Sequence, residues 1–311
     1  MEDDVMPQQF TEIEVLQNFS IQACDIKKLQ AAGYYTVDRV CMTMPKKLAE
    51  IKGLSDAKVA KIQEECRKLC PRFQFQSGLD VAAARQESLI RITTGSDDLD
   101  HILGGGIETG SITCVFGEYR TGKSQLALTM AVACQTPMEQ KGANARSIVI
   151  DTEGSFRTER IVEVAERFGL PGRDVRAPAA AHAPRRAPTP APPRQVLANM
   201  QVARVYTPDQ VEECLIAASA ICRREEHRLV IIDSIISPFR FEYAGRGELS
   251  ERQIRLGQIL RLAKKLADEF NVAVLLTNQV MADPGNSVRR AIAPPRAPPP
   301  SPPHRRRRLT A

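Results

Sequence analysis

A phosphate-binding loop is the clearest chemical signature in the sequence. It follows the pattern GxxxxGK[ST] through eight consecutive residues, which are Gly117, Glu118, Tyr119, Arg120, Thr121, Gly122, Lys123 and Ser124. Glycines let successive backbone amides point into one concavity, where they hold phosphate oxygens together with the positive end of the following helix. We therefore predict that this loop and the adjacent Gln125 bind ATP, that Lys123 reaches its β- and γ-phosphates, and that Ser124 binds Mg²⁺.

Three polar residues that follow apolar runs complete a candidate site for ATP hydrolysis. Asp233 ends the run at 229–232 and is predicted to hold Mg²⁺ through water. Glu153, after the run at 147–150, is our candidate for orienting the attacking water, and Gln279, after the run at 272–276, is placed to sense the γ-phosphate. We assign catalysis to Glu153, Lys123 and Gln279. The alternatives are a cap or turn residue for Asp233 and an exposed loop residue for Glu153.

These residues need a parallel sheet that brings the ends of several strands to one edge. Short apolar runs at 112–116, 147–150, 229–232 and 272–276 are separated by helical stretches, a pattern typical of βαβ units. Runs of four or five apolar residues suit strands that are buried on both faces. The sequence thus predicts an α/β core with a mainly parallel central sheet over residues 92–288.

Residues 1–70 are predicted to form a small all-α domain, because apolar residues recur there at helical spacing. A helix at 45–51, a glycine turn and a helix at 56–69 make a helix-hairpin-helix pattern, with Ser55 as the N-cap of the second helix. Such a turn can aim backbone amides at a DNA phosphate, with Lys52 and Lys58 nearby, or it can be a plain helical hairpin. Residues 71–91 are predicted to be a linker.

Two segments, 173–194 and 289–311, are rich in arginine and hold 13 of the 21 prolines. They carry net charges of +4 and +7, so the remaining residues carry −5 of the total of +6. Because proline lacks an amide donor and these segments cannot pack a core, we expect a disordered insert and a disordered basic tail. The total charge is therefore no evidence for DNA binding.

Several classes of protein are excluded by composition. The eight cysteines lack the paired CxxC spacing of a zinc or redox site, so we expect reduced thiols. The N-terminal ten residues have no apolar core of a signal peptide, and no apolar run approaches the length that crosses a bilayer. We therefore expect an intracellular protein with no membrane segment.

Four stretches are similar to the eukaryotic Rad-type recombinases, which have a RecA-like core. They are GEYRTGKS at 117–124, DTEGSFR at 151–157, IIDSIISPFRFEYAGRGELSERQ at 231–253 and LLTNQVMADPG at 275–285. The resemblance covers nearly all of 14–285 outside the insert, and 281–285 looks more like the meiosis-specific member. It implies a nuclear, DNA-dependent ATPase that forms filaments on single-stranded DNA, pairs it with double-stranded DNA, and acts in meiotic recombination and double-strand-break repair without covalent chemistry on DNA.

The resemblance also implies roles for individual residues. Arg160 matches a residue that lies against the nucleotide base, and Arg240, Arg246 and Arg252 match residues that contact DNA. The family threads a Phe-x-x-Ala segment into the adjacent protomer, and here Phe75 begins the corresponding segment, with glycine in place of alanine. The alternatives are solvated surface arginines, and phenylalanines that pack onto their own domain. Other recombinases and mediators are further expected partners.

The sequence departs from the family at the insert and after Gly285, where the second DNA-binding loop and the segment that caps a neighbour's ATP are expected. Our hypothesis is that both foreign segments are translated intron or frameshifted sequence. We expect such a tail to leave a sheet edge unpaired and to impair strand exchange. An alternative function is that of a truncated, non-catalytic regulator that binds full-length recombinase protomers.

Overall fold

A computed structural model describes residues 10–170, 194–243 and 246–280 of the chain. Its centre is a five-stranded sheet whose strands are all parallel, in the order β3-β7-β6-β4-β5. The strands are β3 (Ile112–Gly117), β4 (Arg146–Asp151), β5 (Met200–Arg204), β6 (His227–Asp233) and β7 (Ala273–Gln279). The predicted α/β fold with a mainly parallel sheet is confirmed. The disorder predicted for 173–194 and 289–311 concerns residues that, apart from Arg194, lie outside the described ones.

Four of these strands overlap the apolar runs of the sequence, but β5 was not predicted. Its sequence, MQVAR, mixes polar and apolar residues, and all its residues except the first are exposed or half-buried. Among the described residues β5 pairs with β4 alone, at one edge of the sheet. An edge strand has less need of a continuous apolar run, so periodicity gave no signal for it.

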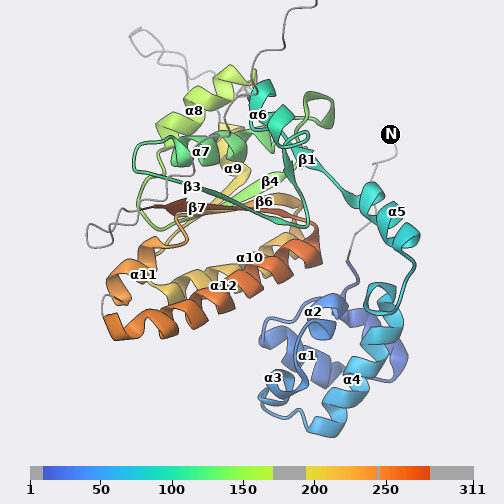
Figure 1. Ribbon diagram of the computed structural model, residues 1–311. Coiled ribbons are helices and arrows are strands. Elements are labelled where there is room, and N and C mark those ends of the chain that lie inside the picture. Colours follow the sequence, from blue (N-terminus) through green and yellow to red (C-terminus); the bar gives the residue numbers. More distant parts are fainter. Residues whose placement is uncertain (1–9, 171–193, 244–245, 281–311) are drawn as a thin grey trace, which may run out of the picture. The chain divides into compact units, whose positions relative to one another are not determined.

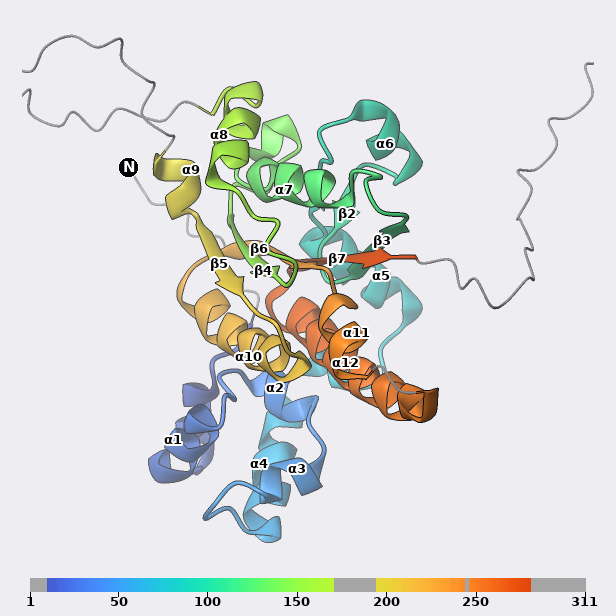
Figure 2. The ribbon, with the colours of Figure 1, turned by 90° about the vertical axis from the view of Figure 1, so that its left-hand side faces the viewer.

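Helices cover both faces of the sheet (Figures 1 and 2). One face carries α7 (Lys123–Ala133), α8 (Thr158–Arg167) and α9 (Arg194–Ala198), and the other carries α10 (Pro208–Arg224), α11 (Ser237–Glu242) and α12 (Leu249–Phe270). Shorter elements of the core are α6 (Asp97–Ile102) and the 3-10 turns at Met138–Gln140 and Arg246–Glu248. The ligand-binding edge of such a sheet lies at the carboxyl ends of its strands.

Alternating side chains of the central strands supply two separate cores. Leu229 and Ile231 of β6 pack with α7 and α8, whereas Val230 and Ile232 pack with α10 and α12. All four side chains are fully buried. This alternation follows from the two-residue period of a strand, and it explains why β6 reads as an uninterrupted apolar run.

The N-terminal helices have their own apolar core. They are the 3-10 helix Ile13–Phe19, α1 (Ala23–Ala31), α2 (Val37–Cys41), α3 (Pro45–Ala49) and α4 (Asp56–Leu69). Gly53, at φ +86°, makes the turn between α3 and α4. The predicted N-cap is confirmed, since the Ser55 hydroxyl accepts a hydrogen bond from the Lys58 amide at 3.4 Å. Both helices of the predicted hairpin are therefore present.

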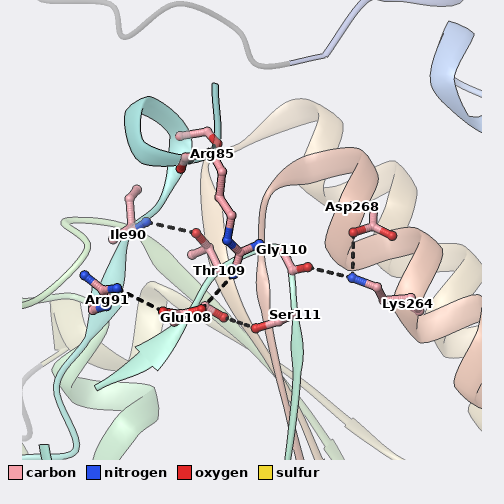
Figure 3. A network of polar contacts seen from close by, with 10 residues as sticks. Arg85, Ile90, Arg91, Glu108, Thr109, Gly110, Ser111, Lys264 and Asp268 are labelled. Carbon is pink, nitrogen blue, oxygen red and sulfur yellow. Dashed lines mark hydrogen bonds and ion pairs between the residues drawn. The ribbon is translucent and has the colours of Figure 1, made fainter. Parts of the chain in front are cut away.

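The segment predicted as a linker contains a 3-10 turn (Pro71–Phe73) and the exposed helix α5 (Gly78–Ser88), and leads into β1 (Arg91–Ile92), which pairs antiparallel with β2 (Ile107–Glu108). Figure 3 shows how α5 is joined to this ribbon: Glu108 accepts from Arg85 at 2.8 Å and from Arg91 at 3.0 Å. Lys264 of α12 donates to the Gly110 carbonyl at 2.8 Å. These contacts fix the entry of the chain into β3.

Candidate nucleotide-binding site

The phosphate-binding loop joins the end of β3 to the start of α7, as the sequence predicted. Gly122 has φ +90° and lies at the N-cap of α7, a backbone conformation that favours glycine. A Cβ on Gly117 would lie 3.0 Å from the Thr121 hydroxyl, so the loop curls tightly at its start. The amides at the N-terminus of α7 have no partners within the helix, which makes this curl suited to polyphosphate.

Lys123 is the first residue of α7 and is 9% exposed. Its Nζ donates to the Glu118 carbonyl at 2.6 Å and to the Thr121 hydroxyl at 3.3 Å. The ammonium group is thus held within the curl of its own loop. A phosphate in the loop can take over the bonds that these neutral oxygens now accept, because charge-assisted bonds to an anion are stronger.

A cavity of about 330 Å³ lies against this loop. It is lined by the loop from Tyr119 to Gln125, by Glu153 and Asp233 after β4 and at the end of β6, and by Thr277 and Gln279 of β7. The structure therefore brings together the predicted phosphate, metal and catalytic residues from the ends of four strands. A hydroxyl and a carboxylate, Ser124 and Asp233, are oxygen ligands of the kind that Mg²⁺ requires, so the donor set fits this ion.

Asp233 is 5% exposed and sits between two hydroxyl groups. Its Oδ2 accepts a hydrogen bond from Ser155 Oγ at 2.9 Å, and its Oδ1 accepts one from the Thr277 hydroxyl. Both donors fix the carboxylate plane without neutralising its charge. Sequence reasoning missed Ser155 and Thr277, although each lies within two residues of a predicted catalytic residue, and that proximity was the available signal.

Glu153 is exposed toward the cavity and accepts hydrogen bonds from two side chains. Ser234 Oγ donates to its Oε1 at 2.9 Å, and Gln279 Nε2 donates to Oε1 at 2.9 Å and to Oε2 at 3.0 Å. Its carboxylate is therefore held between β6 and β7.

The turn that carries Glu153 is shaped by Asp151, the last residue of β4. Asp151 is 3% exposed, and its Oδ1 accepts from the amides of Glu153, Gly154 and Ser155 at 2.7–3.1 Å. Its Oδ2 accepts from the Phe156 amide at 3.1 Å. One buried carboxylate thus satisfies four backbone donors, a role that sequence reasoning did not assign.

Gln279 is also hydrogen-bonded to Arg240 of α11, which the resemblance matched to a residue that contacts DNA. Arg240 Nη1 donates to Gln279 Oε1 at 3.2 Å, and Nη2 donates to the Gln279 carbonyl at 2.9 Å. Arg252 lies in the first turns of α12, and Arg246 begins the 3-10 turn that precedes this helix. The three arginines therefore come from the segment between the end of β6 and the start of α12.

Arg160 lies on α8 beside the phosphate-binding loop. Its Nε donates to Gln125 Oε1 at 2.7 Å, and its Nη1 pairs with Glu163 at 2.6 Å. The predicted neighbour of the nucleotide base thus contacts Gln125, which lies in the first turn of α7 and lines the cavity.

Two other predicted sites lie outside this cavity. Phe75 is fully exposed, so the alternative that it packs onto its own domain is wrong. In the helical hairpin, Lys58 pairs with Asp25 at 2.9 Å and Lys28 donates to the Gly53 carbonyl at 3.0 Å. Hydrogen bonds from Lys58 and Lys28 hold the pKa of Asp25 below its usual value. Lys58 is therefore already engaged by a carboxylate.

No helix in the described part of the chain is both long and apolar enough to cross a membrane. The family model described as Rad51 matches residues 85–184 and 191–299. The match is interrupted within the proline-rich insert and continues past Gly285, so the expectation that the resemblance stops at that residue is wrong.

Curated relatives agree with this family match. A meiotic recombination protein DMC1 homolog from Glycine max is 46% identical over 279 residues, which cover 90% of this chain and 74% of that protein. The corresponding homolog from Lilium longiflorum is 47% identical over 90% of this chain and 73% of its own length. DNA repair protein RAD51 homolog 1 from Arabidopsis thaliana is 45% identical over 87% of this chain and 72% of its own. The chain belongs to the Rad51 family and is a recombinase of the type that includes the DMC1 homologs.

Proposed function

We propose that this chain is an ATP-dependent recombinase that forms filaments on single-stranded DNA and pairs it with homologous duplex DNA in meiotic recombination and repair. The observation that carries the proposal is the single cavity in which the phosphate-binding loop, Asp233, Glu153 and Gln279 meet. No covalent change to DNA is needed, because the chemistry at this cavity acts on ATP alone. A nuclear location follows from this role.

The loop from Gly117 to Ser124 would hold the phosphates of ATP. Backbone amides at the start of α7 bind the phosphate oxygens, and Lys123 exchanges the Glu118 carbonyl for the β- and γ-phosphates. Ser124 and Asp233 would hold Mg²⁺, which supplies positive charge beside the transferring phosphoryl group. Arg160 and Gln125 lie beside the loop, where Arg160 would cover the base.

Glu153 would orient the water that attacks the γ-phosphate. A carboxylate accepts the hydrogen bond of such a water, and the Ser234 hydroxyl donates to Glu153 Oε1 at 2.9 Å and holds the carboxylate in place. Gln279, whose amide lines the same cavity, would contact the γ-phosphate oxygens. Positioning of this kind contributes most of the catalysis in phosphoryl transfer.

DNA would be bound by the basic residues of the segment that follows β6. Arg240, Arg246 and Arg252 would contact the phosphates, since arginine forms bidentate bonds with them. Filament assembly would use Phe75, which is fully exposed, and the edge strand β5 of a neighbouring protomer would receive it. Glycine at position 78, where the family has alanine, removes one methyl group and weakens this anchor by about 0.8 kcal/mol.

The test is ATP turnover with and without single-stranded DNA. We expect turnover that DNA stimulates and that Lys123→Ala abolishes. Lys141→Ala is the matched control, because among the described residues the Lys141 ammonium forms an ion pair with the exposed Asp97 alone. Turnover that Lys123→Ala leaves unchanged would overturn the proposed site. Binding to a full-length recombinase without any turnover would support the non-catalytic regulator instead.

A further inference from the structure

We infer that Arg240 is a positioning residue that restrains Gln279, and through it Glu153, until a DNA phosphate takes its guanidinium. The inference rests on the proposed function, because it concerns how DNA regulates ATP hydrolysis at the same cavity. It assigns Arg240 a second role beside DNA contact. The restraint is a chain of three side chains, Arg240, Gln279 and Glu153.

The orientation of the Gln279 amide is fixed from both ends. Arginine can only donate hydrogen bonds, and it lies 3.2 Å from Gln279 Oε1. A carboxylate can only accept them, and both oxygens of Glu153 lie within 3.0 Å of Gln279 Nε2. The two partners demand the same placement of the amide oxygen and nitrogen. A bond at one end therefore strengthens the bond at the other, because the charged groups polarise the amide in the same direction.

Arg240 also holds the main chain at this point, since its Nη2 donates to the Gln279 carbonyl at 2.9 Å. Gln279 is the last residue of β7 and is half-buried. On the other side, Phe239 is fully buried in the core, so the backbone next to Arg240 is anchored. The mobile part of this link is consequently the Arg240 side chain itself.

The restraint has a direct consequence for Glu153. Gln279 occupies acceptor positions on both of its oxygens, and Ser234 occupies one more. A water molecule aimed at the γ-phosphate needs an acceptor position on the same carboxylate. Release of Gln279 frees two of these positions and lets its amide turn toward the γ-phosphate. Basal hydrolysis is thus slowed while Arg240 holds Gln279.

DNA competes for the same donors. The fork of Arg240 formed by Nη1 and Nη2 faces two oxygens of Gln279. A DNA phosphate that binds this fork bidentately must displace both of them. Phosphate carries a full negative charge, whereas the two oxygens of Gln279 are neutral, so the exchange is favourable. DNA binding and release of Gln279 therefore become one event.

The test compares variants that separate the restraint from the DNA contact. Arg240→Ala should raise turnover without DNA about fivefold, the factor that loss of one ordinary hydrogen bond produces, and should bring the ratio of DNA-stimulated to basal turnover close to one. Arg240→Lys keeps a cation for phosphate but loses the fork, so it should raise basal turnover while retaining most DNA affinity. Arg261→Ala, an exposed arginine bonded only within α12 in the described part of the chain, is the control and should leave basal turnover unchanged.

A double variant checks that the effect passes through Gln279. If it does, Arg240→Ala should add nothing to the basal turnover of Gln279→Ala. Basal turnover that stays equal or falls in both Arg240 variants, in a wild-type protein that DNA does stimulate, overturns the inference. A wild type that DNA fails to stimulate instead overturns the proposed function. Circular dichroism of each variant shows that it is folded, and Arg240→Lys remains as the second test if Arg240→Ala does not fold.

Discussion

Asp151 lies opposite Asp233 in the register of β4 and β6, yet the two carboxylates bind different partners. Asp233 accepts from two side-chain hydroxyls and lines the cavity. Asp151 accepts from four backbone amides and faces its own turn. Two acidic residues at neighbouring strand ends thus divide the tasks of facing the substrate and shaping the loop that faces it.

The first prediction concerns Asp151. Asp151→Ala leaves four amides without their acceptor, and we expect it to lower the free energy of unfolding by about 2–4 kcal/mol and kcat at least about tenfold, with a smaller change in the KM for ATP. Asp151→Asn keeps an oxygen that can accept from three of the amides. Its stability and kcat should therefore lie between those of wild type and Asp151→Ala. Urea unfolding and steady-state kinetics measure both. Exposed Asp97→Asn is the control, and equal kinetics for Asp151→Ala and wild type would refute the role.

The second prediction concerns the metal. Thr277 is 1% exposed and donates to Asp233, so Thr277→Val keeps its volume but removes the bond. We expect the Mg²⁺ concentration for half-maximal turnover to rise about tenfold, because a bond to a charged group is lost. Thr113→Val, the same substitution at a threonine of β3, is the matched control and should leave the Mg²⁺ dependence unchanged. An unchanged Mg²⁺ dependence in Thr277→Val would show that the bond from Thr277 does not support metal binding at Asp233.

The third prediction is a pH dependence of stability. Burial lowers the pKa of His227 below 6.5, and among the described residues its Nε2 has no hydrogen-bond partner. Below pH 6.5 the unfolded chain binds a proton that the folded chain does not, so this residue destabilises the fold increasingly as the pH falls from 6.5 toward its lowered pKa. His227→Leu should therefore lose less stability than wild type over this range, measured by urea unfolding at several pH values.

The exposed His101 provides the control for that measurement. His101→Leu should follow the wild-type pH dependence, and the difference between each variant and wild type removes the contribution of other groups that titrate in this range. Parallel curves for His227→Leu and wild type would contradict the prediction.

The fourth prediction concerns assembly. Phe75→Ala removes a fully exposed aromatic side chain that makes no contribution to its own core, so the stability of the protomer should not change. If Phe75 anchors one protomer to the next, the variant loses about 2–3 kcal/mol of binding free energy at each interface. Its oligomers should then dissociate at higher protein concentrations than those of wild type. Analytical ultracentrifugation measures the distribution of oligomeric states in each protein. Met44→Ala, at another exposed apolar residue, is the control, and unchanged oligomers in Phe75→Ala would exclude this anchor.

The sequence was sufficient for the features that depend on local pattern. Apolar runs located β3, β4, β6 and β7, and loop spacing located the phosphate site, because a buried strand and a glycine-rich turn leave direct signals. It could not predict β5, whose exposed edge position needs no apolar run. Nor could it predict the bonds of Asp151 or the link from Arg240 to Gln279, which join residues through tertiary geometry rather than spacing.

We propose that Glu153 orients the water that attacks ATP held by the phosphate-binding loop. The sharpest test of this role is Glu153→Gln, which keeps the size of the side chain but removes its charge. We predict wild-type affinity for ATP with Mg²⁺, measured by calorimetry, together with a loss of turnover of about a hundredfold or more. Turnover equal to that of wild type, in a variant that binds ATP normally, would contradict the account.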